Sequence, residues 1–273
     1  MTMSLSPSPS TREGVSGARC LTLAALLFLG FSVTAAAQET PPGDAEVVVL
    51  LHGLARSSSS MSRLARSLES AGYRVCNLSY PSRKYSIEKL TTEFVAKSIR
   101  ACTAGTALPV NFVTHSLGGI VVRQLAASAP DIDIGRVVML SPPNHGSEVV
   151  DKLGGLFLFR LINGPAGQEL GTDSLSVPRS LGEPRFDLGV ITGNRSVNPF
   201  LSLLIPGKDD GKVSLESAKL VAMKDFLVIS SSHPFIMKNS EAIAQTLYFL
   251  RNGAFAHPAQ QAVAADRAKV RSG

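Results

Sequence analysis

Ser116 has the residue type and the setting of a nucleophile. It lies in the segment 114–119 (THSLGG), directly after an apolar run at Val110–Val113 and before a helical pattern. A serine on such a tight strand-to-helix turn has a strained backbone, so the residues two before and two after it must be small. Gly118 meets this demand, whereas Thr114 stands where glycine is usual. On this segment alone, a serine that merely caps a helix is the alternative interpretation.

A second turn supplies backbone donors for the same site. His52 and Gly53 follow the apolar run Val47–Leu51, so this turn can aim the N–H of Leu54 toward the point that the N–H of Leu117 faces. Two such donors stabilise a tetrahedral oxyanion, and losing one costs about 3 kcal/mol of transition-state stabilisation. The alternative is that the turn only packs at the end of a strand.

A serine nucleophile needs a histidine base, and the chain has five histidines. We favour His233, because it follows the last apolar run and precedes the last helical pattern. His145, in the segment 142–147 (PPNHGS), is the rival. His52 and His115 flank the two turns and are interpreted as architectural, while His257 lies in the terminal tail.

An acid must orient this histidine and offset its charge. The segment 207–211 (GKDDG) supplies adjacent carboxylates, Asp209 and Asp210. The two side chains project differently, so only one of them can be the orienting acid. A solvated Asp-Gly turn is the alternative for this segment in isolation.

The order Ser116, Asp210, His233 is that of one large class of hydrolases. From about residue 46 to 254 the chain resembles the lipase/esterase branch of the α/β-hydrolase superfamily, and in particular bacterial exported lipase-like proteins. Four motifs carry the resemblance in the same order, namely LHGL (51–54), THSLGG (114–119), Asp-Gly-x-Val (210–213) and Ser-His (232–233).

The resemblance implies roles for particular residues. The acid becomes Asp210, the aspartate directly before glycine, and the oxyanion donors become the N–H groups of Leu54 and Leu117. The expected reaction is cleavage of a small-molecule or lipid acyl ester through an acyl-enzyme on Ser116, with His233 as base. No cofactor and no metal site are expected.

Two other functions remain open. A thioesterase, amidase or acyltransferase would use the same three residues. A catalytically silent hydrolase fold that binds lipid or protein is the second alternative, because fold does not fix function.

The elements that must position these residues follow from the alternation of apolar runs with helical patterns. This alternation predicts an α/β fold with a mostly parallel sheet and helices on both faces. The candidate strands are Val47–Leu51, Tyr73–Leu78, Val110–Val113, Val137–Leu140, Leu188–Ile191 and Phe226–Ile229.

A long insertion interrupts this rhythm at about residues 146–184. Segments of this length usually have a function, often that of a lid. It contains an apolar patch over 156–162, from which Leu156 and Phe159 are expected to contact the acyl chain of the substrate. The alternative is that the patch docks on the domain as an ordinary cap helix.

The N-terminus has the pattern of a signal peptide over residues 1–37. Arg12 and Arg19 precede the apolar run Leu21–Val33, and three alanines follow at 35–37. The run is shorter than the roughly 18 residues that span a bilayer. We therefore expect a periplasmic or secreted protein, and an uncleaved N-terminal anchor is the alternative.

The remaining divisions of the chain are a leader (38–45), the hydrolase domain (46–254) and a disordered tail (255–273). A net charge of +6, spread along the chain, is too diffuse for a nucleic-acid footprint. A charge of this size is compatible with weak attraction to anionic lipid, so peripheral membrane contact is a possible further interaction.

Removal of the signal peptide leaves two cysteines, Cys76 and Cys102. In the hydrolase fold both are expected near the end of the sheet away from the site, and an oxidising compartment favours their pairing. Two unpaired buried thiols are the alternative.

Overall fold

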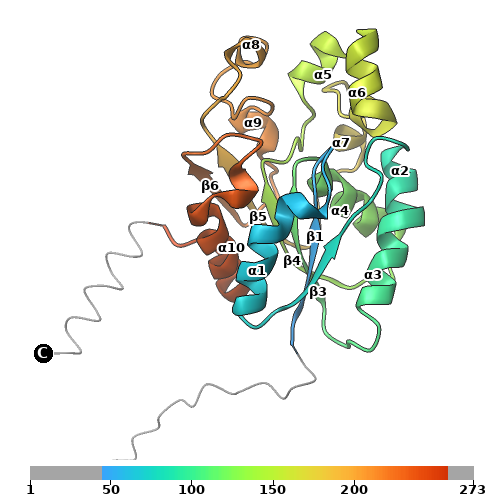
Figure 1. Ribbon diagram of the computed structural model, residues 1–273, viewed down its shortest axis with the longest axis vertical. Coiled ribbons are helices and arrows are strands. Elements are labelled where there is room, and N and C mark those ends of the chain that lie inside the picture. The colour runs from blue at the N-terminus through green and yellow to red at the C-terminus, as the bar shows by residue number, and fades with distance from the viewer. Residues whose placement is uncertain (1–44, 258–273) are drawn as a thin grey trace, which may run out of the picture. The chain divides into compact units, whose positions relative to one another are not determined.

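A parallel sheet of six strands runs through the part of the chain that the computed structural model describes, residues 45–257 (Figure 1). Its strand order is β2-β1-β3-β4-β5-β6, and every neighbouring pair is parallel. The predicted fold class is therefore confirmed. The strands are β1 (Val47–Leu51), β2 (Arg74–Leu78), β3 (Val110–His115), β4 (Ile134–Leu140), β5 (Asp187–Gly193) and β6 (Asp225–Ile229).

Helices cover both faces of this sheet. One face packs against α2 (Ile87–Lys89), its continuation η2 (Leu90–Val95) and α3 (Ala96–Cys102), and against α4 (Leu117–Ser128). The other face packs against α1 (Ser62–Ser70) and α10 (Ser240–Asn252), and the short turns η1 (Ser58–Met61) and η3 (Ile236–Lys238) lie beside them. Burial on both faces explains why β1 and β3 are wholly buried, as their continuous apolar runs predict.

The remaining helices lie beyond the carboxyl ends of the strands, in the upper part of Figure 1. The predicted insertion contains α5 (Glu148–Leu153), α6 (Phe157–Gln168) and α7 (Val177–Ser180), and α8 (Pro199–Ser202) and α9 (Leu215–Ala218) follow β5. A kink divides α6 at Gly164, whose φ of 63° suits glycine, and Pro165 begins the next turn. The lid function of the insertion stays a prediction.

Arg123 fastens the insertion to α4. Its buried guanidinium donates to the carbonyl oxygen of Asn144, just before the insertion, and to those of Pro178 and Gly182 near its end. Burial lowers the pKa of Arg123 to about 10, so the side chain still carries its charge at neutral pH. Both ends of the insertion are thus attached to the helix that begins next to Ser116.

The end of the domain differs from the predicted boundary at residue 255. Phe255 is fully buried and packs against Phe249 of α10, with ring centroids 4.9 Å apart. His257 contacts the carboxylate of Asp225 at 2.8 Å. The predicted tail is therefore wrong for residues 255–257, because a buried aromatic ring anchors them.

The rest of that tail, the signal peptide and the leader up to residue 44 lie outside the described residues. Between residues 45 and 257, no helix has the length and apolar character needed to cross a membrane.

Cys76 and Cys102 form a disulfide between β2 and the end of α3. Cys76 is the middle residue of β2, so its end of the bond lies farther from the edge of the sheet than the sequence predicts. The sequence separation of 26 residues corresponds to about 3 kcal/mol of loop-closure stabilisation.

Candidate active site

Ser116 occupies a strained turn between β3 and α4. Its φ of 52° and ψ of −120° are unfavourable for a residue with a side chain, and such strain is concentrated at functional sites. A Cβ on Gly118 would collide with the carbonyl oxygen of Leu51, which explains glycine at this position. Thr114 is completely buried at the end of β3, so this turn accommodates threonine where glycine is usual.

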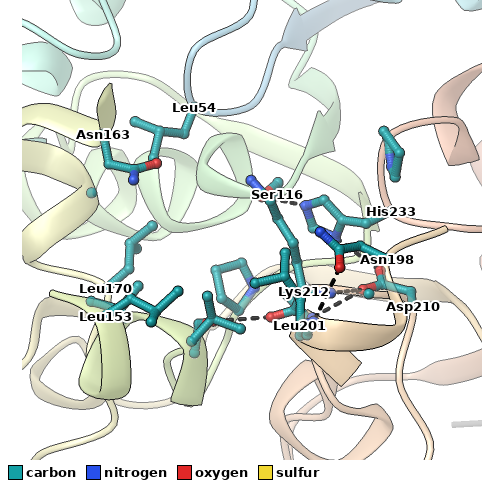
Figure 2. A pocket seen from close by; sticks show the side chains of 18 of the residues that line it. Leu54, Ser116, Leu153, Asn163, Leu170, Asn198, Leu201, Asp210, Lys212 and His233 are labelled. Atoms are coloured by element: carbon teal, nitrogen blue, oxygen red, sulfur yellow. Dashed lines mark hydrogen bonds and ion pairs between the residues drawn. The ribbon is translucent and has the colours of Figure 1, made fainter. Parts of the chain in front are cut away.

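The side chain of Ser116 is hydrogen-bonded to His233, and His233 in turn to Asp210 (Figure 2). Nε2 of His233 lies 3.0 Å from Oγ of Ser116, and Nδ1 lies 2.9 Å from Oδ2 of Asp210. With its proton on Nδ1, the imidazole donates to the carboxylate and accepts from the serine hydroxyl. This is the arrangement in which a histidine can take a proton from serine.

The adjacent carboxylates have separate contacts. Asp210 is fully buried, and its Oδ1 accepts from the backbone N–H groups of Lys212 and Val213 at 3.0 and 2.9 Å. Asp209 points elsewhere, because its Oδ1 accepts from the hydroxyl of Ser202 and the N–H of Gly211, both at 2.7 Å. Of the two, only Asp210 reaches His233.

Electrostatics keep Asp210 ionised. Burial alone would raise its pKa, but the charge and hydrogen bond of His233 and the backbone N–H of Val213 outweigh burial. The pKa of Asp210 therefore lies below its ordinary value, and the carboxylate is charged at neutral pH. A buried anion beside Nδ1 stabilises the imidazolium that forms when His233 takes a proton.

Two other histidines contact the segments that surround the candidate triad. His115 is buried, and its Nε2 lies 3.0 Å from the carbonyl oxygen of His233, which holds the loop of that residue. His52, two residues before Leu54 in the chain, stacks on Tyr80 with ring centroids 4.2 Å apart. Burial lowers the pKa of both, so both rings are neutral and their architectural interpretation fits these contacts.

His145 and His257 lie outside the cavity that contains Ser116. The backbone N–H of His145 donates to the carbonyl of Ser217. Burial and the nearby charges of Arg179 and Arg123 lower its pKa. The imidazole of His257 is hydrogen-bonded to the carboxylate of Asp225. Of the five histidines, only His233 contacts Ser116.

Leu54 and Leu117 were predicted to supply oxyanion donors. Leu117 begins α4 directly after Ser116, and Leu54 lines the same cavity as the serine. Within residues 45–257 neither backbone N–H donates to a protein acceptor. Both amides are therefore available to a ligand, and their role as donors stays a prediction.

A cavity of about 440 Å³ contains Ser116 and His233. Figure 2 shows Leu153, Asn163 and Leu170 on one side of Ser116 and His233, Asn198 and Asp210 on the other, with Lys212 between the two groups. The apolar wall comes from the insertion and consists of Val149, Val150, Leu153, Phe159, Ile162 and Leu170.

The predicted substrate contacts divide into two cases. Phe159 lines the cavity, whereas Leu156 does not and is 57% exposed, and the contact of both residues with substrate stays a prediction. Leu156 directly precedes the first turn of α6, and its side chain lies in solvent. The apolar patch does not simply dock on the domain either, because Phe157, Leu158 and Leu161 are also exposed. The predicted peripheral membrane contact stays a prediction.

Several polar residues of the cavity were not anticipated from the sequence. Arg56 follows Leu54 by two residues, Lys212 follows Asp210 by two, and Asn198 comes from the loop after β5. For the two cations, the position just after a predicted motif is the signal that could have revealed them. Residues 45–257 contain no cluster of three or more histidine, cysteine or acidic side chains arranged to hold a metal ion.

Comparison with known proteins agrees with this architecture. Residues 46–168 match the family model described as the alpha/beta hydrolase fold. A 44-residue segment is 48% identical to a triacylglycerol lipase of Pseudomonas fragi, which corresponds to 16% of this chain and only 15% of that lipase.

Solved structures extend the likeness over the whole domain. The mature form of the lipase BlEst2 of Bacillus licheniformis is similar over 79% of this chain and 94% of its own, with 19% identity and a TM-score of 0.60. The metagenomic carboxyl esterase MGS0156 is similar over 73% of this chain and 69% of its own, with 19% identity and a TM-score of 0.54. The chain therefore has the α/β-hydrolase fold.

Proposed function

We propose that this protein is a serine hydrolase that cleaves carboxylic esters through an acyl-enzyme intermediate. The observation that carries the proposal is the continuous hydrogen-bonded series from Ser116 through His233 to Asp210, three residues that line a largely apolar cavity. The matched segment of a triacylglycerol lipase supports an ester as substrate.

Each residue has a chemical task in this reaction. Ser116 attacks the ester carbonyl, and His233 takes the hydroxyl proton and then delivers it to the departing alcohol. Asp210 orients the imidazole and offsets its positive charge. The N–H groups of Leu54 and Leu117 hold the oxyanion, and water then releases the acid from Ser116 by the same steps.

A panel of p-nitrophenyl esters tests this function, together with labelling by a fluorophosphonate probe. We expect turnover of the esters and a single labelled residue, Ser116. Labelling without turnover of any ester would favour a thioesterase, amidase or acyltransferase. Failure of both would favour the silent binding module.

We also propose that the insertion selects acyl chain length. Phe159 is partly buried in the apolar wall, where each buried methylene of a substrate gains about 0.8 kcal/mol. Phe159→Ala should therefore lower kcat/KM progressively more as the acyl chain grows from acetate to decanoate.

Phe157→Ala is the matched control, because Phe157 is on the same helix but 80% exposed and outside the cavity. This variant should leave the dependence on chain length as it is in the wild type. A loss in Phe159→Ala that is uniform across chain lengths would mean that the ring only supports the fold.

Finally, we propose that the protein is exported and begins at Gln38 after cleavage of its signal peptide. The disulfide between Cys76 and Cys102 supports an oxidising compartment. N-terminal sequencing of the exported protein tests the cleavage site, and retention of residues 21–33 would favour the anchored form.

A further inference from the structure

Two cations line the cavity beside the candidate triad. Arg56 belongs to the turn that carries Leu54, and Lys212 belongs to the turn that carries Asp210. Each cation is therefore two residues from a group with a proposed role in the reaction. The function proposed above uses neither of them.

Neither cation has a side-chain partner in the described part of the protein. No hydrogen bond or ion pair joins the guanidinium of Arg56 or Nζ of Lys212 to another group within residues 45–257. Among these residues, Asp210 is the only acidic one that lines the cavity, and its carboxylate oxygens are taken by His233 and by backbone N–H groups. The cavity lining thus holds two cations against one carboxylate, and that carboxylate is already hydrogen-bonded to His233.

The backbone of Lys212 is fixed from both sides. Its N–H donates to Oδ1 of Asp210 at 3.0 Å, and its carbonyl accepts from the hydroxyl of Ser147 at 2.9 Å. The side chain is accessible to solvent even though the walls of the cavity enclose it. This enclosure and the charge of Arg56 lower the pKa of Lys212, while Asp210 opposes the shift.

The two cations also lie close to the candidate triad. Burial and the charge of His233 are the main causes of the low pKa of His115, and the charges of Arg56 and Lys212 lower it further. The ring of His115 lies 5.0 Å from that of His233. Both side chains are exposed to solvent, which screens their charges, but like charges repel each other, so lining one cavity with two cations still carries an electrostatic penalty. An anionic ligand would remove this penalty.

The two walls of the cavity indicate where such an anion belongs. Lys212 belongs to the same turn as Asp210 and lies apart from Leu153 and Leu170 in Figure 2. An ester bound at Ser116 would extend its acyl chain along the apolar wall and its alcohol portion toward the cations. A phosphate suits this pair, because its several oxygens can accept from a forked guanidinium and from an ammonium together.

We propose that the cavity binds esters of a phosphorylated alcohol, with Arg56 and Lys212 holding the phosphate while the acyl chain lies against the apolar wall. This inference rests on the proposed ester hydrolysis and names the substrate class of the same site. The substrates it describes are amphiphilic, with a fatty acyl chain on one side of the scissile bond and a phosphate on the other.

Two substrates that differ only in the phosphate test the proposal, namely 1-lauroyl lysophosphatidic acid and 1-lauroylglycerol. The wild type should show at least about a tenfold higher kcat/KM for the phosphorylated ester. The double variant Arg56→Gln/Lys212→Gln should bring the ratio of the two kcat/KM values close to one, and Lys212→Arg should largely preserve it.

Lys208→Gln is the matched control, because Lys208 is an exposed cation of the same turn that does not line the cavity. Its ratio should equal that of the wild type. A wild type that prefers 1-lauroylglycerol, or a double variant that keeps the wild-type ratio, would overturn the proposal.

Inhibition separates a lipid-borne phosphate from free phosphate. Dodecyl phosphate should compete with p-nitrophenyl butyrate, and its inhibition constant should rise about tenfold in the double variant. Inorganic phosphate that inhibits as strongly as dodecyl phosphate would overturn the assignment to an ester.

Failure of the proposed function would look different. In that case neither the lauroyl esters nor p-nitrophenyl butyrate would be hydrolysed. Hydrolysis of the neutral esters without a phosphate preference would contradict this inference alone.

Discussion

Ser116→Ala should reduce ester hydrolysis by at least about 10³-fold, because it removes the atom that forms the acyl-enzyme. The fold should be unaffected. The side chain is only partly buried, and among the described residues its hydrogen bond to His233 is the one side-chain hydrogen bond that the substitution removes. We therefore expect a wild-type melting temperature together with loss of both turnover and fluorophosphonate labelling.

The two strongest candidates for the base provide an internal control for this experiment. His233→Ala should lose activity on the same scale, since Nε2 of His233 is the group beside the serine hydroxyl. His145→Ala should retain activity, because His145 does not line the cavity. Activity that survives in His233→Ala but disappears in His145→Ala would refute the assignment of the base.

The strands were predictable from sequence because the central ones are buried on both faces. A continuous apolar run such as Val47–Leu51, with turns and helical patterns around it, is typical of a strand covered on both sides. The meeting of the motifs in space was predictable for a related reason. Parallel strands bring their carboxyl ends to one edge, so Ser116 and His233 were expected to meet although 117 residues separate them.

The insertion was less predictable because burial depends on its packing and not on its composition. The sequence shows an apolar patch over 156–162, but a helix turns neighbouring residues to different sides. In α6 this places Phe159 in the cavity and leaves Phe157 in solvent. Without knowledge of the kink at Gly164 and the anchor at Arg123, the orientation of the helix could not be derived.

The cations were missed because a position just after a predicted motif does not by itself show that a side chain lines the cavity. Arg56 and Lys212 are 156 positions apart and become neighbours only when the turns after β1 and β5 meet at the edge of the sheet. The boundary at residue 255 was misplaced for a similar reason. A single Phe255 in an alanine-rich tail does not reveal that its ring is buried against Phe249.

Asp210→Asn should lower kcat by about 10² to 10⁴-fold, and Asp209→Asn should change it little. Asparagine at position 210 removes the negative charge that stabilises the imidazolium. Its amide can also donate to Nδ1 of His233, which would hold the ring in the tautomer that cannot accept the serine proton. Measurement of kcat and KM on one p-nitrophenyl ester should show the loss in kcat.

Asp209→Asn is the sharpest control in the chain, because it makes the same chemical change one residue away. The contacts of Asp209 run through one oxygen, which accepts from the hydroxyl of Ser202 and the N–H of Gly211. An asparagine carbonyl oxygen can accept both of these hydrogen bonds, so the turn should keep its shape. Equal losses in the two variants would mean that activity depends on the shape of the turn, and a larger loss in Asp209→Asn would transfer the role of the acid to Asp209.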